Sequence, residues 1–268
     1  MRDNQIIKGV LTTGTNRSFG ESLWELGPPL GTFGCSSVAA YDSDGNEPIA
    51  LTADMPDSTM LATTVDPAIL TLMRIPGDKV DRSMTNLPLR DVKAVSDLAG
   101  TERIAAKAGS QQTKTAEPTQ AEPAGPITLG DWRRAKGEAS IKCRNNLNRI
   151  SLEFSGLIPN RLYSAWGMFN NSGMLAAVAL GGAPSVFVTD SEGNATFKRV
   201  LNFCPFQPVQ GQPPLLYIDI LYHSDHMVYG LVPDLTLSGL MGGLVAHSQM
   251  EFPFAVTPAP KNQDRKTR

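Results

Sequence analysis

The sequence has no long apolar run, only three histidines and no cysteine pattern typical of a metal site. Without a run of about 18 apolar residues, it contains no candidate membrane-spanning helix. Its cysteines, Cys35, Cys143 and Cys204, have neither zinc-finger nor Cys-x-x-Cys spacing, which argues against a structural zinc and a thioredoxin-type site. No GxSxG, HExxH, P-loop or helix-opening GxGxxG motif is found. The sequence therefore indicates no particular enzyme class.

Cations are missing from one stretch of the chain. The net charge is −2 and the isoelectric point is about 5.9, which argues against a nucleic-acid partner. No Lys or Arg occurs between Arg17 and Arg74. We favour a solvated acidic surface there over a face for a basic partner or a cation. The acidic residues of this interval are Glu21, Glu25, Asp42, Asp44, Glu47, Asp54, Asp57 and Asp66.

The composition predicts a folded, mainly β chain. Hydrophobic residues make up 41% of the sequence, and 24 Gly and 20 Pro favour strands and turns over long helices. Residues 105–126 are rich in Pro, Ala, Gln and Thr and are predicted to be a linker. We therefore expect a β-rich, partly extended N-terminal region over 1–104, an antiparallel β-sandwich over 127–257 and a basic flexible tail over 258–268.

The sandwich region shows clear alternation of apolar and polar residues. The cap pair Thr128 and Asp131 predicts a short helix that presents Trp132, with Gly137 ending the turn. Strands with one solvent-facing side are expected over 138–143 and 148–157. A hairpin is expected around the turn 191–194. The predicted inward residues of the two strands are Ala139, Ile141, Cys143, Ile150, Leu152 and Phe154.

Two later segments predict further strands of the same sheets. Residues 215–222 are apolar on both faces, which is typical of a central strand. In the closing strand, Met250, Phe252, Phe254 and Val256 alternate, and Pro253 predicts an edge position.

One short motif resembles a known architecture. Leu157, Pro159 and Tyr163 have the spacing of the turn-then-strand corner of fibronectin-type and immunoglobulin-like sandwiches. The resemblance implies that the hydroxyl of Tyr163 bonds back to the preceding loop. It covers about ten residues and lacks the Cys…Trp…Cys signature, so it supports an architecture and not membership of a family.

The N-terminal region carries weaker signals. Residues 6–14 and 35–55 are expected to form short strands, the second set around the turn at Asp44 and Gly45. Residues 66–73 begin with a cap-and-proline pair, and residues 92–108 have weak helical periodicity. We expect a small lobe that leans on the sandwich or on another protein.

Two metal-binding hypotheses arise from the sequence, although no cofactor is expected. His223 and His226 flank a predicted turn, and with His247 and Asp225 they would form a zinc or copper site if the turn brings them together. Backbone-bonding turn residues are the favoured interpretation. Residues 42–47 have alternating oxygen ligands for calcium, but a hairpin turn is favoured. Asp219, in an apolar strand, is a candidate for a raised pKa or a buried partner, but pairing with Arg or with backbone donors is favoured.

The function we expect is a non-enzymatic binding or structural module. It would be an accessory subunit that stabilises a larger protein assembly, membrane-associated or not, without spanning the membrane itself. The alternatives are a zinc or copper protein that uses the three histidines, and a carbohydrate-binding sandwich that stacks sugars on Trp132, Trp166 and Tyr222. Candidate contact residues lie in the uncharged segment 235–246 and in the N-terminal region: Leu235, Leu240, Met241, Leu244, Trp24 and Phe33.

Localisation and cysteine pairing stay open at this stage. The first residues contain no apolar signal region, whereas the sandwich style and turn chemistry favour an extracytoplasmic location, periplasmic or extracellular. A bridge between Cys143 and Cys204 is one alternative, and small buried thiols are the one we favour.

Overall fold

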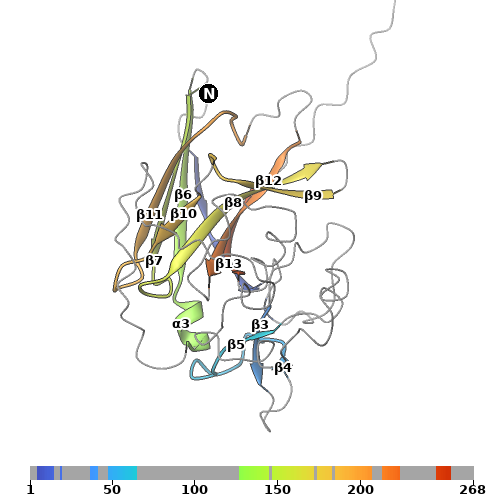
Figure 1. Cartoon of the computed structure of the whole chain (residues 1–268), viewed down its shortest axis with the longest axis vertical. Helices are drawn as coiled ribbons and strands as arrows, with labels where there is room; N and C mark the ends of the chain where they lie inside the picture. The colour runs from blue at the N-terminus through green and yellow to red at the C-terminus, as the bar shows by residue number, and fades with distance from the viewer. Residues whose placement is uncertain are drawn as a thin grey trace, which may run out of the picture.

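The chain folds as a mainly β protein with two antiparallel sheets packed as a sandwich, as predicted (Figure 1). The structure is a computed structural model, and it describes residues 5–14, 19, 37–41, 48–64, 127–144, 147–171, 174–182, 185–206, 213–223 and 246–254. None of the helices in these ranges has the length and apolarity needed to cross a membrane.

The described elements are short strands and one helix. In chain order they are β1 (Gln5–Lys8), β2 (Val10–Gly14), β3 (Ser37–Tyr41), β4 (Pro48–Ile49), β5 (Ala62–Thr64), α3 (Leu129–Arg133), β6 (Lys136–Arg144), β7 (Leu147–Ser155), β8 (Leu162–Asn171), β9 (Met174–Ala179), β10 (Val186–Val188), β11 (Ala195–Leu201), β12 (Leu215–His223) and β13 (Ala246–Pro253).

The four-stranded sheet has the order β1-β6-β7-β11. Ala139 and Ile141 of β6 lie opposite Leu152 and Ile150 of β7, and all four are buried on the inner face. This confirms the predicted alternation. Charged residues and serines occupy the alternate positions on the outer face, as period-two strands with one wet face require.

The six-stranded sheet has the order β10-β8-β12-β13-β2, and β9 continues the pairing along β8 beyond β10. β12 lies between β8 and β13, which confirms the predicted central strand. A register irregularity near Leu215 places this residue in the main core and Leu216 on the other face. Strict alternation along β12 would instead place Leu216, and not Leu215, on the same face as Ile218.

The start of the chain joins the two sheets. β1 pairs with β6 in one sheet, and β2 pairs with β13 in the other. Gly9 makes the crossing, and a Cβ atom there would lie 2.2 Å from the Sδ atom of Met250. Only glycine therefore lets the backbone approach the core this closely without a shift of that side chain.

A small sheet, β4-β3-β5, packs against α3 below the sandwich (Figure 1). The pairing of β3 with β4 confirms the expected N-terminal strands, although the turn residues 42–47 lie outside the described ranges. The guanidinium of Arg133 donates to the backbone oxygens of Thr52, Ala53 and Met55. The described N-terminal segment thus leans on the sandwich, while the predicted domain boundaries stay predictions.

The helix and the tyrosine corner match their predictions. Thr128 and Asp131 form a reciprocal capping box, and Trp132 is fully buried. The hydroxyl of Tyr163 accepts a hydrogen bond from the backbone N–H of Ile158 at 3.0 Å, which is the bond that the corner requires. It also donates to Oε1 of Gln249 at 2.7 Å, so it ties the loop to β13.

Two local predictions were wrong in ways that the topology explains. The turn at 190–194 forms, but its flanking strands do not pair: β10 joins the six-stranded sheet and β11 the four-stranded one. Pro253 does not mark an edge, because β13 lies between β12 and β2. Pro253 ends β13 beyond Glu251, the last residue paired with β2, so it removes no donor from that pairing.

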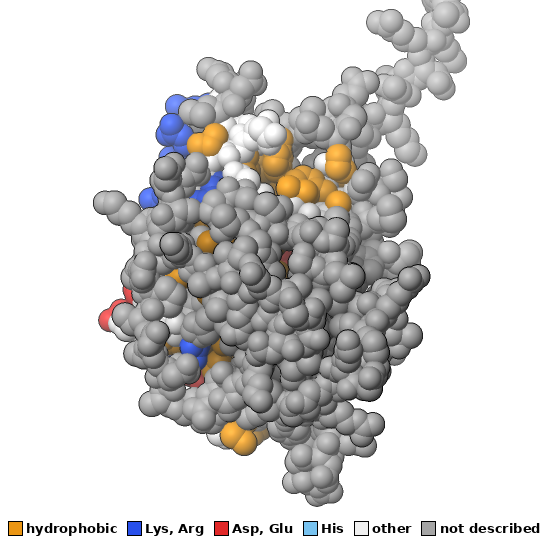
Figure 2. All heavy atoms as spheres, in the orientation of Figure 1, with side chains coloured by type: hydrophobic (Ala, Val, Ile, Leu, Met, Phe, Trp, Pro, Cys, Tyr) orange, Lys and Arg blue, Asp and Glu red, His pale blue; other side chains and the backbone are white. Residues whose placement is uncertain are grey.

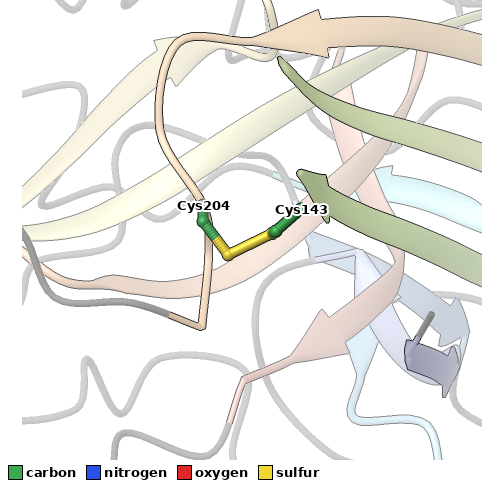
Figure 3. The surroundings of a disulfide bond; sticks show 2 residues. All are labelled: Cys143 and Cys204. Carbon is green, nitrogen blue, oxygen red and sulfur yellow. A yellow bond between two sulfur atoms is a disulfide. The ribbon is translucent and has the colours of Figure 1, made fainter. Parts of the chain in front are cut away.

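Two further predictions need correction. Gly137 does not end the helix, whose C-cap is Arg134; it lies in β6, where a Cβ atom would lie 2.5 Å from the Sδ atom of Met250. Cys143 and Cys204 are not buried thiols but form a disulfide, with their Cα atoms 5.7 Å apart (Figure 3). Cys143 points inward from β6, and Cys204 follows β11. The bridge therefore ties the segment after β11 to the end of β6, an inner strand of the same sheet.

Candidate functional site

The histidines proposed as metal ligands do not share one face of the sheet. Tyr222 faces the main core and lies opposite His247, with the two ring centroids 6.0 Å apart. His223 follows Tyr222 in β12 and therefore points to the other face, where its Nε2 lies 2.7 Å from Oγ of Ser164. His226 and Asp225 lie outside the described residues. No group of three metal-binding side chains occurs within the described ranges.

The remaining residues singled out from the sequence are distributed as follows. Trp132 and Tyr222 are buried in the main core, and Trp166 is buried on the other face of β8, so these rings form no exposed stacking surface. The possible calcium ligands in 42–47 lie outside the described ranges, as do all six contact residues: Leu235, Leu240, Met241, Leu244, Trp24 and Phe33. Those assignments stay predictions.

Ser164 and His223 are part of a buried polar group on the outer face of the six-stranded sheet. The indole N–H of Trp166 donates to Oγ of Ser164 at 2.8 Å. The serine hydroxyl and Nε2 of His223 share a further hydrogen bond, and the tautomer of the imidazole decides which of the two donates. All three side chains are buried. This arrangement satisfies polar groups within a sheet face.

Two carboxyl groups lie side by side on the same face. Asp219 of β12 is directly opposite Glu251 of β13. Burial raises the pKa of Asp219 to about 7, although it accepts hydrogen bonds from the hydroxyl of Ser248 and from a backbone N–H. Burial and the charge of Asp219 raise the pKa of Glu251 to about 8. Asp219 thus has a raised pKa and also the backbone donor that we favoured for it, whereas its partly buried neighbour Glu251 was missed.

An apolar groove opens where the edges of the two sheets meet. Its volume is about 590 Å³. Val178 of β9 and Val200 of β11 are 52% and 53% exposed and contribute to its lining. Phe169 and Phe203 also line it, with ring centroids 5.5 Å apart in an edge-to-face contact. The groove thus combines exposed aliphatic side chains with an aromatic wall, which is the usual character of a binding site.

The disulfide supports one wall of this groove. Asn202 and Phe203 line it and directly precede Cys204, whose bridge to Cys143 anchors the segment to β6 (Figure 3). Gly181, on the other wall, packs against the side chain of Arg199, which turns inward from β11. An inward charged residue on an edge strand is a common device against unwanted pairing of that edge. The groove is therefore held by covalent and packing contacts.

One apolar residue in an outward-facing position of β11 indicates the groove in the sequence. In β11, Thr196, Lys198 and Val200 occupy the solvent-facing positions of the alternation. Valine is the apolar exception in this series, and such exceptions indicate contact surfaces when they cluster. β9 has no comparable alternation, so Val178 could not be assigned to either face.

The sequence matches no protein-family model and no curated protein. The groove and its surroundings are therefore the guide to function.

Proposed function

We propose that this protein is a non-enzymatic binding module that serves as an accessory subunit of a larger protein assembly. The observation that carries the proposal is the convergence of Val178 and Val200, from two different sheets, on one apolar groove. Scattered exposed valines are ordinary on a protein surface. Two that line the same concave surface beside Phe169 and Phe203 are better explained by contact with a partner.

The disulfide supports an extracytoplasmic location for this assembly, periplasmic or extracellular. Disulfides persist in oxidising compartments and are rare in the cytosol of most organisms. Alkylation of the protein taken directly from its source should therefore modify neither Cys143 nor Cys204 before reduction, and both after it. Modification of both cysteines without a reductant would contradict the proposed location.

Native mass spectrometry of gently isolated protein tests the assembly. We expect additional mass of kilodaltons in a fixed ratio. Val178→Asp and Val200→Asp should reduce the bound fraction, because a carboxylate in the groove must be desolvated when a partner covers it. Ile6→Asp is the matched control, since Ile6 is similarly exposed but lies on β1, at the opposite edge of the four-stranded sheet from β11.

The variants separate a groove-dependent assembly from other outcomes. The proposal predicts that the two groove variants lose the partner and that the control retains it. Equal loss in all three would show that the groove is not the contact, and a chain that is always monomeric would contradict the accessory role itself.

A further inference from the structure

A row of side chains crosses the outer face of the four-stranded sheet and ends at the groove. Lys142 of β6 lies directly opposite Arg149 of β7, and Arg149 lies directly opposite Val200 of β11. Directly opposed residues in an antiparallel pair have Cβ atoms about 4.5–5.5 Å apart, so the three side chains are neighbours. Val200 also lines the groove. Lys142 and Arg149 are therefore contiguous with the apolar lining of the groove.

This end of the sheet is strongly basic. Arg144 follows two positions after Lys142, and Lys198 lies two positions before Val200; both are exposed on the same face. Figure 2 shows Lys and Arg side chains gathered at this end of the molecule, at the upper left, with hydrophobic side chains beside them. The cations are thus concentrated next to the groove.

The opposed cations cost stability unless an anion approaches them. Like charges directly opposite each other on a sheet are destabilising. Within the described part of the chain, Lys142, Arg149 and Lys198 take part in no ion pair. At the other end of the same face, Glu138 lies opposite Glu153 but also opposite Lys8, which offsets the repulsion. The basic end has no such compensation among the described residues.

We infer that the groove and the basic row form one binding surface for an acidic segment of a partner protein, in which aliphatic side chains alternate with carboxylates. The inference rests on the proposed binding function and names the chemistry of the partner. Aliphatic side chains fill the groove beside Val178 and Val200, while carboxylates pair with Arg149 and its neighbours. The charge attracts the segment and sets its orientation, and the groove supplies the apolar contact.

The combination of features favours a protein segment over other polyanions. A sulfated polysaccharide has no aliphatic side chains with which to fill the groove beside Phe169 and Phe203. A membrane surface is flat and would not enter a concave site. The chain as a whole carries a net charge of −2, so the basic row is a local feature and not part of a generally basic protein.

The test is an NMR titration of the full chain with a capped peptide that has four Glu-Val repeats. We expect shifts at the amides of Arg149, Val178 and Val200, and affinity that falls with added salt. A Lys-Val peptide and a Glu-Ser peptide should not bind, because each keeps only one of the two required features.

Charge reversal provides the matched variants. Arg149→Glu should weaken binding of the Glu-Val peptide about tenfold or more, since it replaces an attraction by a repulsion. Lys136→Glu is the control, because Lys136 is exposed on the same strand and face as Lys142 but lies at the other end of β6. Equal effects of the two reversals would overturn the inference, as would the absence of peptide binding.

Two further probes identify the other outcomes. Binding of a heparin oligosaccharide or of phosphatidylserine vesicles through Arg149, without binding of the peptide, would overturn the choice of a protein partner. An assembly that depends on Val178 but is insensitive to salt and to Arg149→Glu would refute the acidic partner and leave the proposed function intact. The absence of any assembly would contradict the function itself.

Discussion

Raising the pH should destabilise the folded protein through the carboxyl pair of Asp219 and Glu251. Their pKa values, about 7 and about 8, lie well above the ordinary values of 3.8 and 4.5, and burial is the largest cause for both. The unfolded chain releases these protons near pH 4, whereas the folded chain retains them to neutral pH. Stability from the protonated pair is therefore fully present in acid and is lost as the pH rises through the folded pKa values.

The magnitude follows from the number of retained protons. Two adjacent carboxyls titrate as a unit, so we count only one of their two protons between about pH 5 and about pH 7, which gives a lower bound. Each such proton gives a slope of about 1.4 kcal/mol per pH unit, or roughly 3 kcal/mol over this interval. For a chain of this size, that corresponds to a fall in Tm of roughly 6–12 °C.

Thermal unfolding followed by circular dichroism, with the double variant Asp219→Asn, Glu251→Gln beside the wild type, checks this prediction. The two amides resemble the protonated carboxyls, so the double variant should lose most of the dependence on pH, whereas Glu251→Gln alone should keep the part that the burial of Asp219 causes. His223 lies on the same face of β12 and is unchanged in these proteins, so the difference between the slopes of the wild type and the double variant isolates the carboxyl pair. Glu153→Gln, on the exposed face of the other sheet, should retain the wild-type slope. Equal slopes for the wild type and the double variant would refute the reasoning.

Three other substitutions test the fold. Replacing Cys143 and Cys204 by serine opens a loop with a sequence separation of 61; denaturant titration should show a loss of about 4 kcal/mol, and an unchanged midpoint would contradict a stabilising bridge. Tyr163→Phe removes both hydrogen bonds of the buried hydroxyl and should cost about 1–3 kcal/mol by the same measurement. Gly193→Ala should cost roughly 2 kcal/mol or more, because it adds a Cβ atom 2.1 Å from a backbone oxygen at a residue with φ of +77°. Gly182→Ala, with φ of +93° and no atom within 4 Å, should cost less, and equal losses would exclude the steric explanation.

Local sequence signals predicted the strands and their faces well. In β6 and β7, strict alternation identified Ala139, Ile141, Ile150 and Leu152 as inward residues, because one face of the sheet is wet. The tyrosine corner was predictable for a similar reason, since Tyr163 bonds to a loop only five residues away. Signals that act over a few residues can be read without knowledge of the topology.

The errors arose where the pairing of distant strands decides the outcome. The turn at 190–194 reverses the chain, but nothing in it specifies that β10 and β11 enter different sheets. The faces of His223 and His247 likewise depend on a register in which His247 lies opposite Tyr222. Glu251 alternates with buried Met250 and Phe252, a pattern typical of a solvent-facing residue, yet β12 places it beside Asp219. Three cysteines alone do not indicate which two will meet.

β10 and β11 enter different sheets, which made the hairpin prediction wrong. The same arrangement explains the position of the groove. At one side of the sandwich the chain passes directly from β1 to β2, and at the other it passes from β10 to β11, so a short connection joins the two sheets on each side. β10, however, covers only residues 162–164 of β8, and β9 takes over the rest of that edge without pairing with β11. The sheets therefore part between β9 and β11, and the exposed valines of these two strands lie at the opening. The groove needs no additional element to form, because β10 pairs with only three residues of β8 and leaves the rest of this side open.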